Sequence, residues 1–130
     1  MAKKKVIIID DDFDILEATK LTLQAAGYDV ATAASGQEGL AKIRGGGIDL
    51  IILDVMMARD TEGFQIAQDL KEDPKFKQIP ILMMTSVSAK SGLSFDPVKD
   101  GDYLPVEDYV DKPVDPADLV QRVAKLLKKN

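Results

Sequence analysis

The distribution of short apolar runs limits the folds open to this chain more than any other feature. Val6–Ile9 is an unbroken run of β-branched residues, and a second run, at residues 48–53, is interrupted by a single acid. Runs of this length and composition are typical of strands buried on both faces of a parallel sheet. Between such runs, apolar residues recur at helical spacing. The alternation therefore predicts an α/β fold.

Five strands and at least four helices are expected. The predicted strands are residues 6–10, 28–33, 48–54, 81–85 and 108–111, and the predicted helices are residues 13–26, 36–44, 63–72 and 116–127. Residues 86–104 keep no apolar stripe, so a fourth helix there is expected to be short or irregular. With right-handed crossovers, these elements form a flavodoxin-like, doubly wound sheet in the order 2-1-3-4-5, with helices on both faces. We expect residues 1–130 to be a single domain.

Composition excludes several classes of function. The chain has 130 residues, no cysteine and no histidine, which rules out thiolate or imidazole metal sites and Ser-His-Asp catalysis. The net charge of −5 argues against direct binding of nucleic acid by this domain. No apolar run is long enough for a membrane span, and the first is too short for a signal peptide. The protein is expected to be cytoplasmic.

Acidic residues follow the two most apolar strands at the point where each strand ends. Asp10, Asp11 and Asp12 come directly after Ile9, and Asp54 comes directly after residue 53. The carboxyl ends of parallel strands share one edge, where ligands bind in open α/β sheets. Crowded carboxylates repel one another unless a cation neutralises them. Because oxygen ligands suit hard cations, we expect Asp10 and Asp11 to bind Mg²⁺, with Mn²⁺ as an alternative.

Two further polar residues follow strands at the same edge. Thr85 ends the predicted fourth strand, and Lys112 follows the fifth. A metal ion and an ammonium group would activate Asp54 for in-line phosphoryl transfer, while the Thr85 hydroxyl donates to a phosphoryl oxygen. Taken singly, each of these residues is more often a turn, strand or loop residue. Asp12 and Asp14 have a structural role as cap and first-turn charge of the first helix.

Together these motifs resemble the receiver domain of two-component response regulators, over essentially the whole chain. The resemblance implies that Asp54 is the phosphoacceptor and that Asp10, Asp11, Asp54 and the backbone carbonyl of Met56 bind the metal ion. It also implies that Thr85 and Lys112 stabilise the phosphoryl group, and that Thr85 and Tyr109 form a conformational switch. Lys112 is followed by Pro113, as is characteristic of the family.

The resemblance implies a signalling role without turnover of a metabolite. A sensor histidine kinase or a phosphotransfer protein would supply the phosphoryl group, and the altered surface of the fourth helix, fifth strand and last helix would control a downstream protein partner. Nucleic acid and membrane are not expected as direct partners. The chain is expected to be a monomer or a phosphorylation-dependent dimer, with self-phosphorylation and autodephosphorylation as its only reactions.

The chain departs from the family pattern in ways that leave the catalytic residues in place. Ala58 stands where a proline is usual, and the segment between Thr85 and Lys112 is longer than usual. Met56 and Val87 occupy the two positions that tune phosphoryl lifetime. Because neither side chain can orient an attacking water, we expect slow autodephosphorylation.

Three alternative functions remain open. One is a phosphorylation-independent interaction domain of the same fold. Another is a Mg²⁺-dependent aspartyl phosphohydrolase, but such enzymes usually carry a second acid two residues after the nucleophile, where this chain has Met56. The third is a flavin- or nucleotide-binding flavodoxin-like protein, which would need a phosphate loop where this chain has Asp10–Asp12.

Overall fold

A computed structural model describes residues 3–54, 62–85, 107–111 and 115–128 of the chain. These residues contain one five-stranded sheet in the order β2-β1-β3-β4-β5, and every strand pair in it is parallel. The strands are β1 Lys5–Ile9, β2 Asp29–Ala33, β3 Leu50–Asp54, β4 Ile81–Thr85 and β5 Asp108–Asp111. The predicted fold class and strand order are confirmed.

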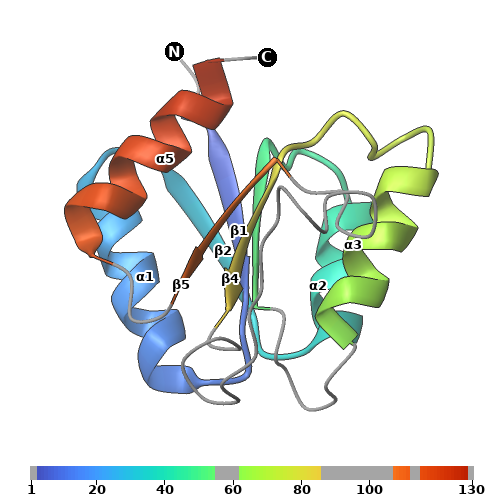
Figure 1. Cartoon of the computed structure of the whole chain (residues 1–130), viewed down its shortest axis with the longest axis horizontal. Coiled ribbons are helices and arrows are strands. Elements are labelled where there is room, and N and C mark those ends of the chain that lie inside the picture. The colour runs from blue at the N-terminus through green and yellow to red at the C-terminus, as the bar shows by residue number, and fades with distance from the viewer. Residues whose placement is uncertain (1–2, 55–61, 86–106, 112–114, 129–130) are drawn as a thin grey trace.

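Helices cover both faces of the sheet. They are α1 Phe13–Ala25, α2 Gly36–Arg44, α3 Glu62–Glu72 and α5 Pro116–Lys128. α1 and α5 lie on one face, and α2 and α3 lie on the other (Figure 1). The fourth helix expected between residues 86 and 104 falls outside the described residues. In the part of the chain that the structure describes, no helix has the length and apolar composition that crossing a bilayer requires.

The apolar side chains of the strands divide between two cores because successive residues of a strand point to opposite faces. Ile7, Ile9, Ile51 and Leu53 pack with side chains of α2 and α3. Their neighbours along the strands, such as Val6, Ile8 and Ile52, pack with α1 and α5. The central strands are therefore buried on both faces, which explains their continuous apolar runs.

Short polar motifs fix the ends of α1. The Asp12 side chain caps this helix by accepting hydrogen bonds from the backbone N–H groups of Asp14 at 3.0 Å and Ile15 at 3.3 Å. Gly27, at φ +100°, lies just beyond the other end, in the left-handed conformation that glycine adopts readily. The chain therefore leaves β1, turns into α1 and returns to β2 through connections that the sequence encodes locally.

The predicted element boundaries agree with the structure to within two residues. β4 and β5 have the predicted limits. β1 begins and ends one residue earlier than expected, at Lys5 and Ile9, and β3 begins at Leu50 rather than at residue 48. Asp49 nevertheless joins the two strands, because its N–H donates to the Lys5 carbonyl and its carboxylate accepts from the Lys5 N–H, each at 2.8 Å.

Candidate functional site

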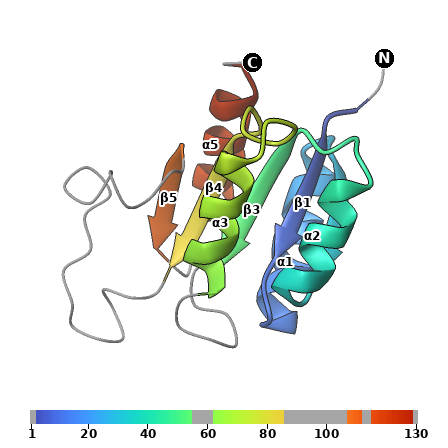
Figure 2. The ribbon, with the colours of Figure 1, turned by 90° about the vertical axis from the view of Figure 1, so that its right-hand side faces the viewer.

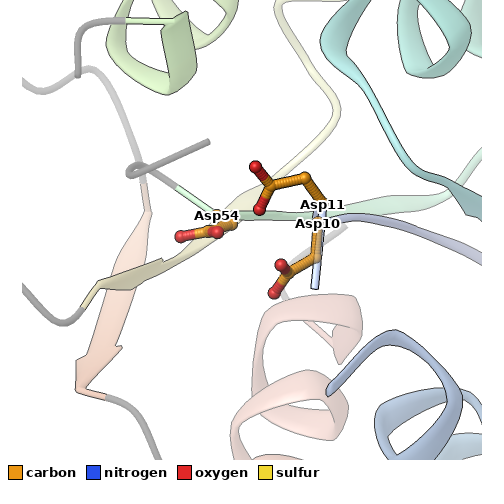
Figure 3. Close-up of side chains that lie close together, drawn as sticks. All are labelled: Asp10, Asp11 and Asp54. Atoms are coloured by element: carbon orange, nitrogen blue, oxygen red, sulfur yellow. The ribbon is translucent and has the colours of Figure 1, made fainter. Parts of the chain in front are cut away.

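The predicted acidic cluster forms where β1 and β3 end side by side. Ile9 pairs with Leu53, and the residues that follow this pair on the two strands are Asp10 and Asp54. Asp10, Asp11 and Asp54 each offer one carboxylate oxygen, and these three oxygens lie within 4.8 Å of one another. Figure 3 shows the three side chains gathered at this edge. Two acids some forty residues apart in the chain thus meet because the strands carrying them are neighbours in the sheet.

The three acids that follow β1 have different roles, which depend on their hydrogen bonds to the backbone. Asp10 Oδ1 accepts a hydrogen bond from the Asp12 N–H at 2.9 Å, and the Asp10 N–H continues the sheet by donating to the Ala33 carbonyl at 3.0 Å. Asp12 turns away to cap α1. Asp10 is thereby held at the edge of the sheet, while Asp11 remains exposed to solvent. The structure places Asp10 and Asp11, but not Asp12, in the cluster with Asp54.

Two of the three acids are buried, so their negative charges are unfavourable unless a cation neutralises them. Asp10 is 0% exposed and Asp54 is 2% exposed. Two unit charges of the same sign about 5 Å apart repel by about 3 kcal/mol at an effective dielectric constant of about 20. A cation among these oxygens would remove that repulsion and compensate for their loss of hydration. The donor set is all oxygen, which suits Mg²⁺ rather than a soft metal.

The spacing of the oxygens also fits a single ion of this kind. With Mg–O distances of about 2.1 Å, two oxygens on opposite sides of one Mg²⁺ are about 4.2 Å apart. A cluster spanning up to 4.8 Å therefore needs only a small side-chain rotation or one bridging water to hold the ion. Mg²⁺ commonly retains several waters, so three carboxylates are sufficient protein ligands.

The remaining predicted site residues are placed by their backbone or fall outside the described residues. Thr85 ends β4 and pairs with Asp111, and Tyr109 lies on β5 opposite Met83. The side chains of Thr85 and Tyr109 are not among those described. Met56, Val87 and Lys112 lie outside the described ranges. Their predicted roles, as well as those of Thr85 and Tyr109, stay predictions.

The sequence indicated every acid of the cluster but not how Asp10 is held. Asp10 accepts from the backbone N–H two residues further along, at Asp12. Aspartate followed by a tight turn frequently makes this bond, so its position just before α1 was the available signal. Among the described acidic residues, no other group of three has its ligand atoms close enough to hold a metal ion.

The family to which the chain belongs follows from a comparison with known protein families. The model of the response regulator receiver domain matches residues 6–124. This chain belongs to the response regulator receiver family. The match spans both strand-end acid motifs, at residues 10–12 and at residue 54.

Relatives with known sequences support the same assignment. The alkaline phosphatase synthesis transcriptional regulatory protein PhoP of Bacillus subtilis is 34% identical over 127 residues, which are 98% of this chain and 50% of PhoP. The chain spans about half the length of the curated relatives that it matches. The receiver domain is therefore the part that it shares with these transcriptional regulators.

Known structures agree with the fold. A putative response regulator from Chloroflexus aurantiacus is 32% identical, with a TM-score of 0.84 over 98% of this chain and 99% of the other. The response regulator TrrA of Thermotoga maritima, crystallised in complex with Mg(2+)-BeF, is 31% identical, with a TM-score of 0.76 over 95% of this chain and 98% of the other. The receiver fold of this chain is thus matched by a structure that holds Mg²⁺.

Proposed function

We propose that this receiver domain accepts a phosphoryl group on Asp54, in a Mg²⁺-dependent reaction, from the phosphohistidine of a sensor histidine kinase or a phosphotransfer protein. The observation that carries the proposal is the convergence of Asp10, Asp11 and Asp54, with carboxylate oxygens within 4.8 Å of one another. Membership of the receiver family supports the reaction class.

In the proposed reaction, the chain's own residues provide the nucleophile and the acids around it. An Asp54 carboxylate oxygen forms the new O–P bond as the N–P bond of the phosphohistidine breaks, and the histidine nitrogen keeps the electron pair. Asp10 and Asp11, with the carbonyl of Met56, would hold Mg²⁺ beside the acceptor. When bound, Mg²⁺ neutralises charge on the transferring phosphoryl oxygens. Asp10 is suited to this role because its hydrogen bond to the Asp12 N–H fixes its orientation.

We propose that the other strand-end residues respond to the phosphoryl group. Lys112 and Thr85 would stabilise its oxygens, and Thr85 with Tyr109 would link it to the surface of β5 and α5, where a downstream protein partner would bind. Met56 and Val87 would leave the aspartyl phosphate long-lived because neither can position a water. Residues 1–130 would act as one domain, in the cytoplasm, where a kinase domain can reach it.

Beryllium fluoride, which coordinates to a carboxylate in the manner of a phosphoryl group, provides a direct test. We expect beryllium fluoride with Mg²⁺ to raise the melting temperature beyond the effect of Mg²⁺ alone and to shift the amide resonances of β4 and β5, and beryllium fluoride without Mg²⁺ to do neither. Asp54→Asn should abolish both effects. The matched control is Asp49→Asn, at the other end of the same apolar run, where the amide oxygen can still accept from the Lys5 N–H. Equal responses of the two variants would contradict the proposal.

A further inference from the structure

A pocket lies at the end of the sheet opposite the acidic cluster. It has a volume of about 340 Å³ and apolar walls made by Ile48, Ile79, Pro80 and Leu127, and Lys4 also lines it. These residues come from the segments that precede β1, β3 and β4 and from the last turn of α5, which lie together at one end of the molecule (Figure 2). A pocket of this size and lining suits one large apolar side chain.

Exposed lysines lie within or next to the chain segments that line the pocket, and one of them, Lys4, is a lining residue. Lys3 and Lys4 precede β1, Lys77 precedes the β4 wall, and Lys128 directly follows Leu127; all four are exposed. The acid that lines the pocket, Asp49, already accepts a hydrogen bond from the Lys5 N–H at 2.8 Å. The pocket and its lysines therefore favour binding of an apolar side chain that is flanked by carboxylates, because the lysines complement negative charge.

The opposite end of the same molecule presents such a segment. Phe13 begins α1 and is 69% exposed, and it stands among the exposed acids Asp11, Asp12 and Asp14. An aromatic ring left in water at the surface is a common anchor for an interface. Figure 1 shows that α1 begins at the end of the sheet away from the two chain termini. Phe13 is the first residue of α1, whereas the pocket lies among residues that precede the strands, so only a second copy can bring the two together.

We propose that copies of this chain associate head to tail, with Phe13 of one copy seated in the Lys4–Leu127 pocket of the next. The carboxylates around Phe13 then lie against the lysines around the pocket. Such a contact is heterologous, because different surfaces of the two copies meet, and it can extend to chains longer than two. The proposal rests on surface shape and charge and not on the phosphoryl chemistry.

The association is expected to be weak. One aromatic side chain and a few surface charges bury much less than the roughly 1,200 Å² at the low end of stable interfaces, so dissociation constants of about 0.1–1 mM are expected. Raising the salt concentration from about 0.1 M to about 1 M shortens the Debye length from about 10 Å to about 3 Å and should weaken the contact several-fold.

Sedimentation velocity on the full chain, from about 10 µM to about 1 mM, tests this affinity range. The weight-average mass of the wild type should rise with concentration. Phe13→Ser and the charge reversal Lys4→Glu/Lys128→Glu should each keep the protein monomeric, with unchanged circular dichroism. Leu21→Ser is the matched control, because Leu21 is 60% exposed on the same helix but outside the acidic segment, and it should associate as the wild type does.

A mixing experiment separates this arrangement from other modes of association. Phe13→Ser retains the pocket, and the lysine variant retains Phe13, so an equimolar mixture should form dimers and nothing larger. A wild type that stays monomeric at the highest concentration would overturn the proposal, and a different partner for the pocket would then be required. A mixture that stays monomeric, or a Leu21→Ser variant as impaired as Phe13→Ser, would overturn it as well.

Discussion

Gly39 of α2 lies so close to Ile9 of β1 that a Cβ atom built on the glycine would stand 2.4 Å from Ile9 Cδ1 and 2.7 Å from Ile9 Cγ1. Ile9 is fully buried and directly precedes Asp10. The missing side chain therefore lets α2 approach the strand that carries the first acids of the site. Glycine destabilises the helix relative to alanine at this position, but it permits the close packing of α2 against β1.

Gly39→Ala is expected to destabilise the protein by up to about 2 kcal/mol. Overpacking a core costs about 1–3 kcal/mol, and alanine returns about 1 kcal/mol of helix propensity. Urea unfolding measures the net change. The matched control is Gly45→Ala at the end of α2, where the nearest atom to an added Cβ is 3.3 Å away and φ is −68°, and this change should cost less. A Gly39→Ala variant as stable as the wild type would show that Ile9 moves aside easily.

Much of this fold could be predicted because local signals agree with one another. The β-branched runs identified the central strands, and Asp12, Ser35 and Gly27 marked helix ends that the structure confirms. The contact between Gly39 and Ile9 was not predictable, because it depends on how closely two elements pack, and no local pattern encodes that distance. Residues 86–104 gave no periodic signal, and they lie outside the described part of the chain.

A lysine at the end of α3 ties three segments together. Lys71 Nζ donates to the carbonyls of Lys77 at 3.1 Å and Ile79 at 2.9 Å, and it pairs with Glu107 Oε2 at 2.8 Å. The other Glu107 oxygen accepts from the Ile81 N–H at 2.8 Å. The network thus joins α3, the approach to β4 and the residue before β5, which is an edge strand of the sheet.

Lys71→Met is expected to cost about 1–3 kcal/mol of unfolding free energy, because it leaves polar partners in a partly buried place without their donor. The Lys71 side chain is only 13% exposed. Chemical denaturation at neutral pH measures the loss. The control pair is Lys20 with Glu17, 3.6 Å apart and more exposed, where Lys20→Met should change stability by less than about 1 kcal/mol. Similar losses in both variants would show that the network has no special role.

The first turn of α2 should make stability depend on pH. The pKa of Glu38 is lowered from its ordinary value of 4.5, first by the hydrogen bond that it accepts from the Ala34 N–H and then by Lys42. A carboxyl group whose pKa is lower in the folded than in the unfolded state stabilises the fold above the unfolded pKa, and that stabilisation is lost as the pH falls through the folded pKa.

Glu38→Gln should therefore be less stable than the wild type at neutral pH, and the difference should shrink as the pH falls below about 4.5. Urea unfolding at several pH values gives the comparison. Ser35→Ala, which removes the uncharged cap on the Glu38 N–H, should cost about 1 kcal/mol at every pH. If the difference in unfolding free energy between Glu38→Gln and the wild type were independent of pH, the charge of Glu38 would not contribute to stability.

Removing the charge of Asp54 should stabilise the protein in the absence of divalent metal. Asp54→Asn relieves repulsion from Asp10 and Asp11, and we expect a gain of about 1–3 kcal/mol in EDTA. The same change should weaken Mg²⁺ binding, so that the stabilisation by saturating Mg²⁺, about 2.7 kcal/mol at 100 times the dissociation constant, becomes smaller.

Thermal unfolding with and without Mg²⁺ tests both effects. Asp14→Asn provides the control, because Asp14 is an exposed acid of the first turn of α1 that lies outside the cluster. It removes the same charge and should leave the Mg²⁺ response unchanged. If Asp54→Asn were destabilised in EDTA, or if Asp14→Asn lost the Mg²⁺ response to the same extent, repulsion within the cluster would not be the cause.

The candidate site was predictable to the extent that it depends on strand ends. The proximity of Asp10 and Asp54 could be predicted from the sequence, because the carboxyl ends of parallel strands share one edge. The sequence could not show that Asp10 would be fully buried while Asp11 stays exposed, since that depends on the turn into α1 and its hydrogen bond to Asp12. The contributions of Thr85, Tyr109 and Lys112 depend on side chains that the structure does not describe.

The most direct measurement is the intact mass of the protein after incubation with phosphoramidate, a small phosphoryl donor, in Mg²⁺ or in EDTA. We predict a single phosphoryl adduct that forms with Mg²⁺, fails to form in EDTA and is absent from Asp54→Asn, while Asp49→Asn behaves as the wild type. An adduct that persists in Asp54→Asn, or that forms equally in EDTA, would contradict Asp54 as a Mg²⁺-dependent phosphoacceptor.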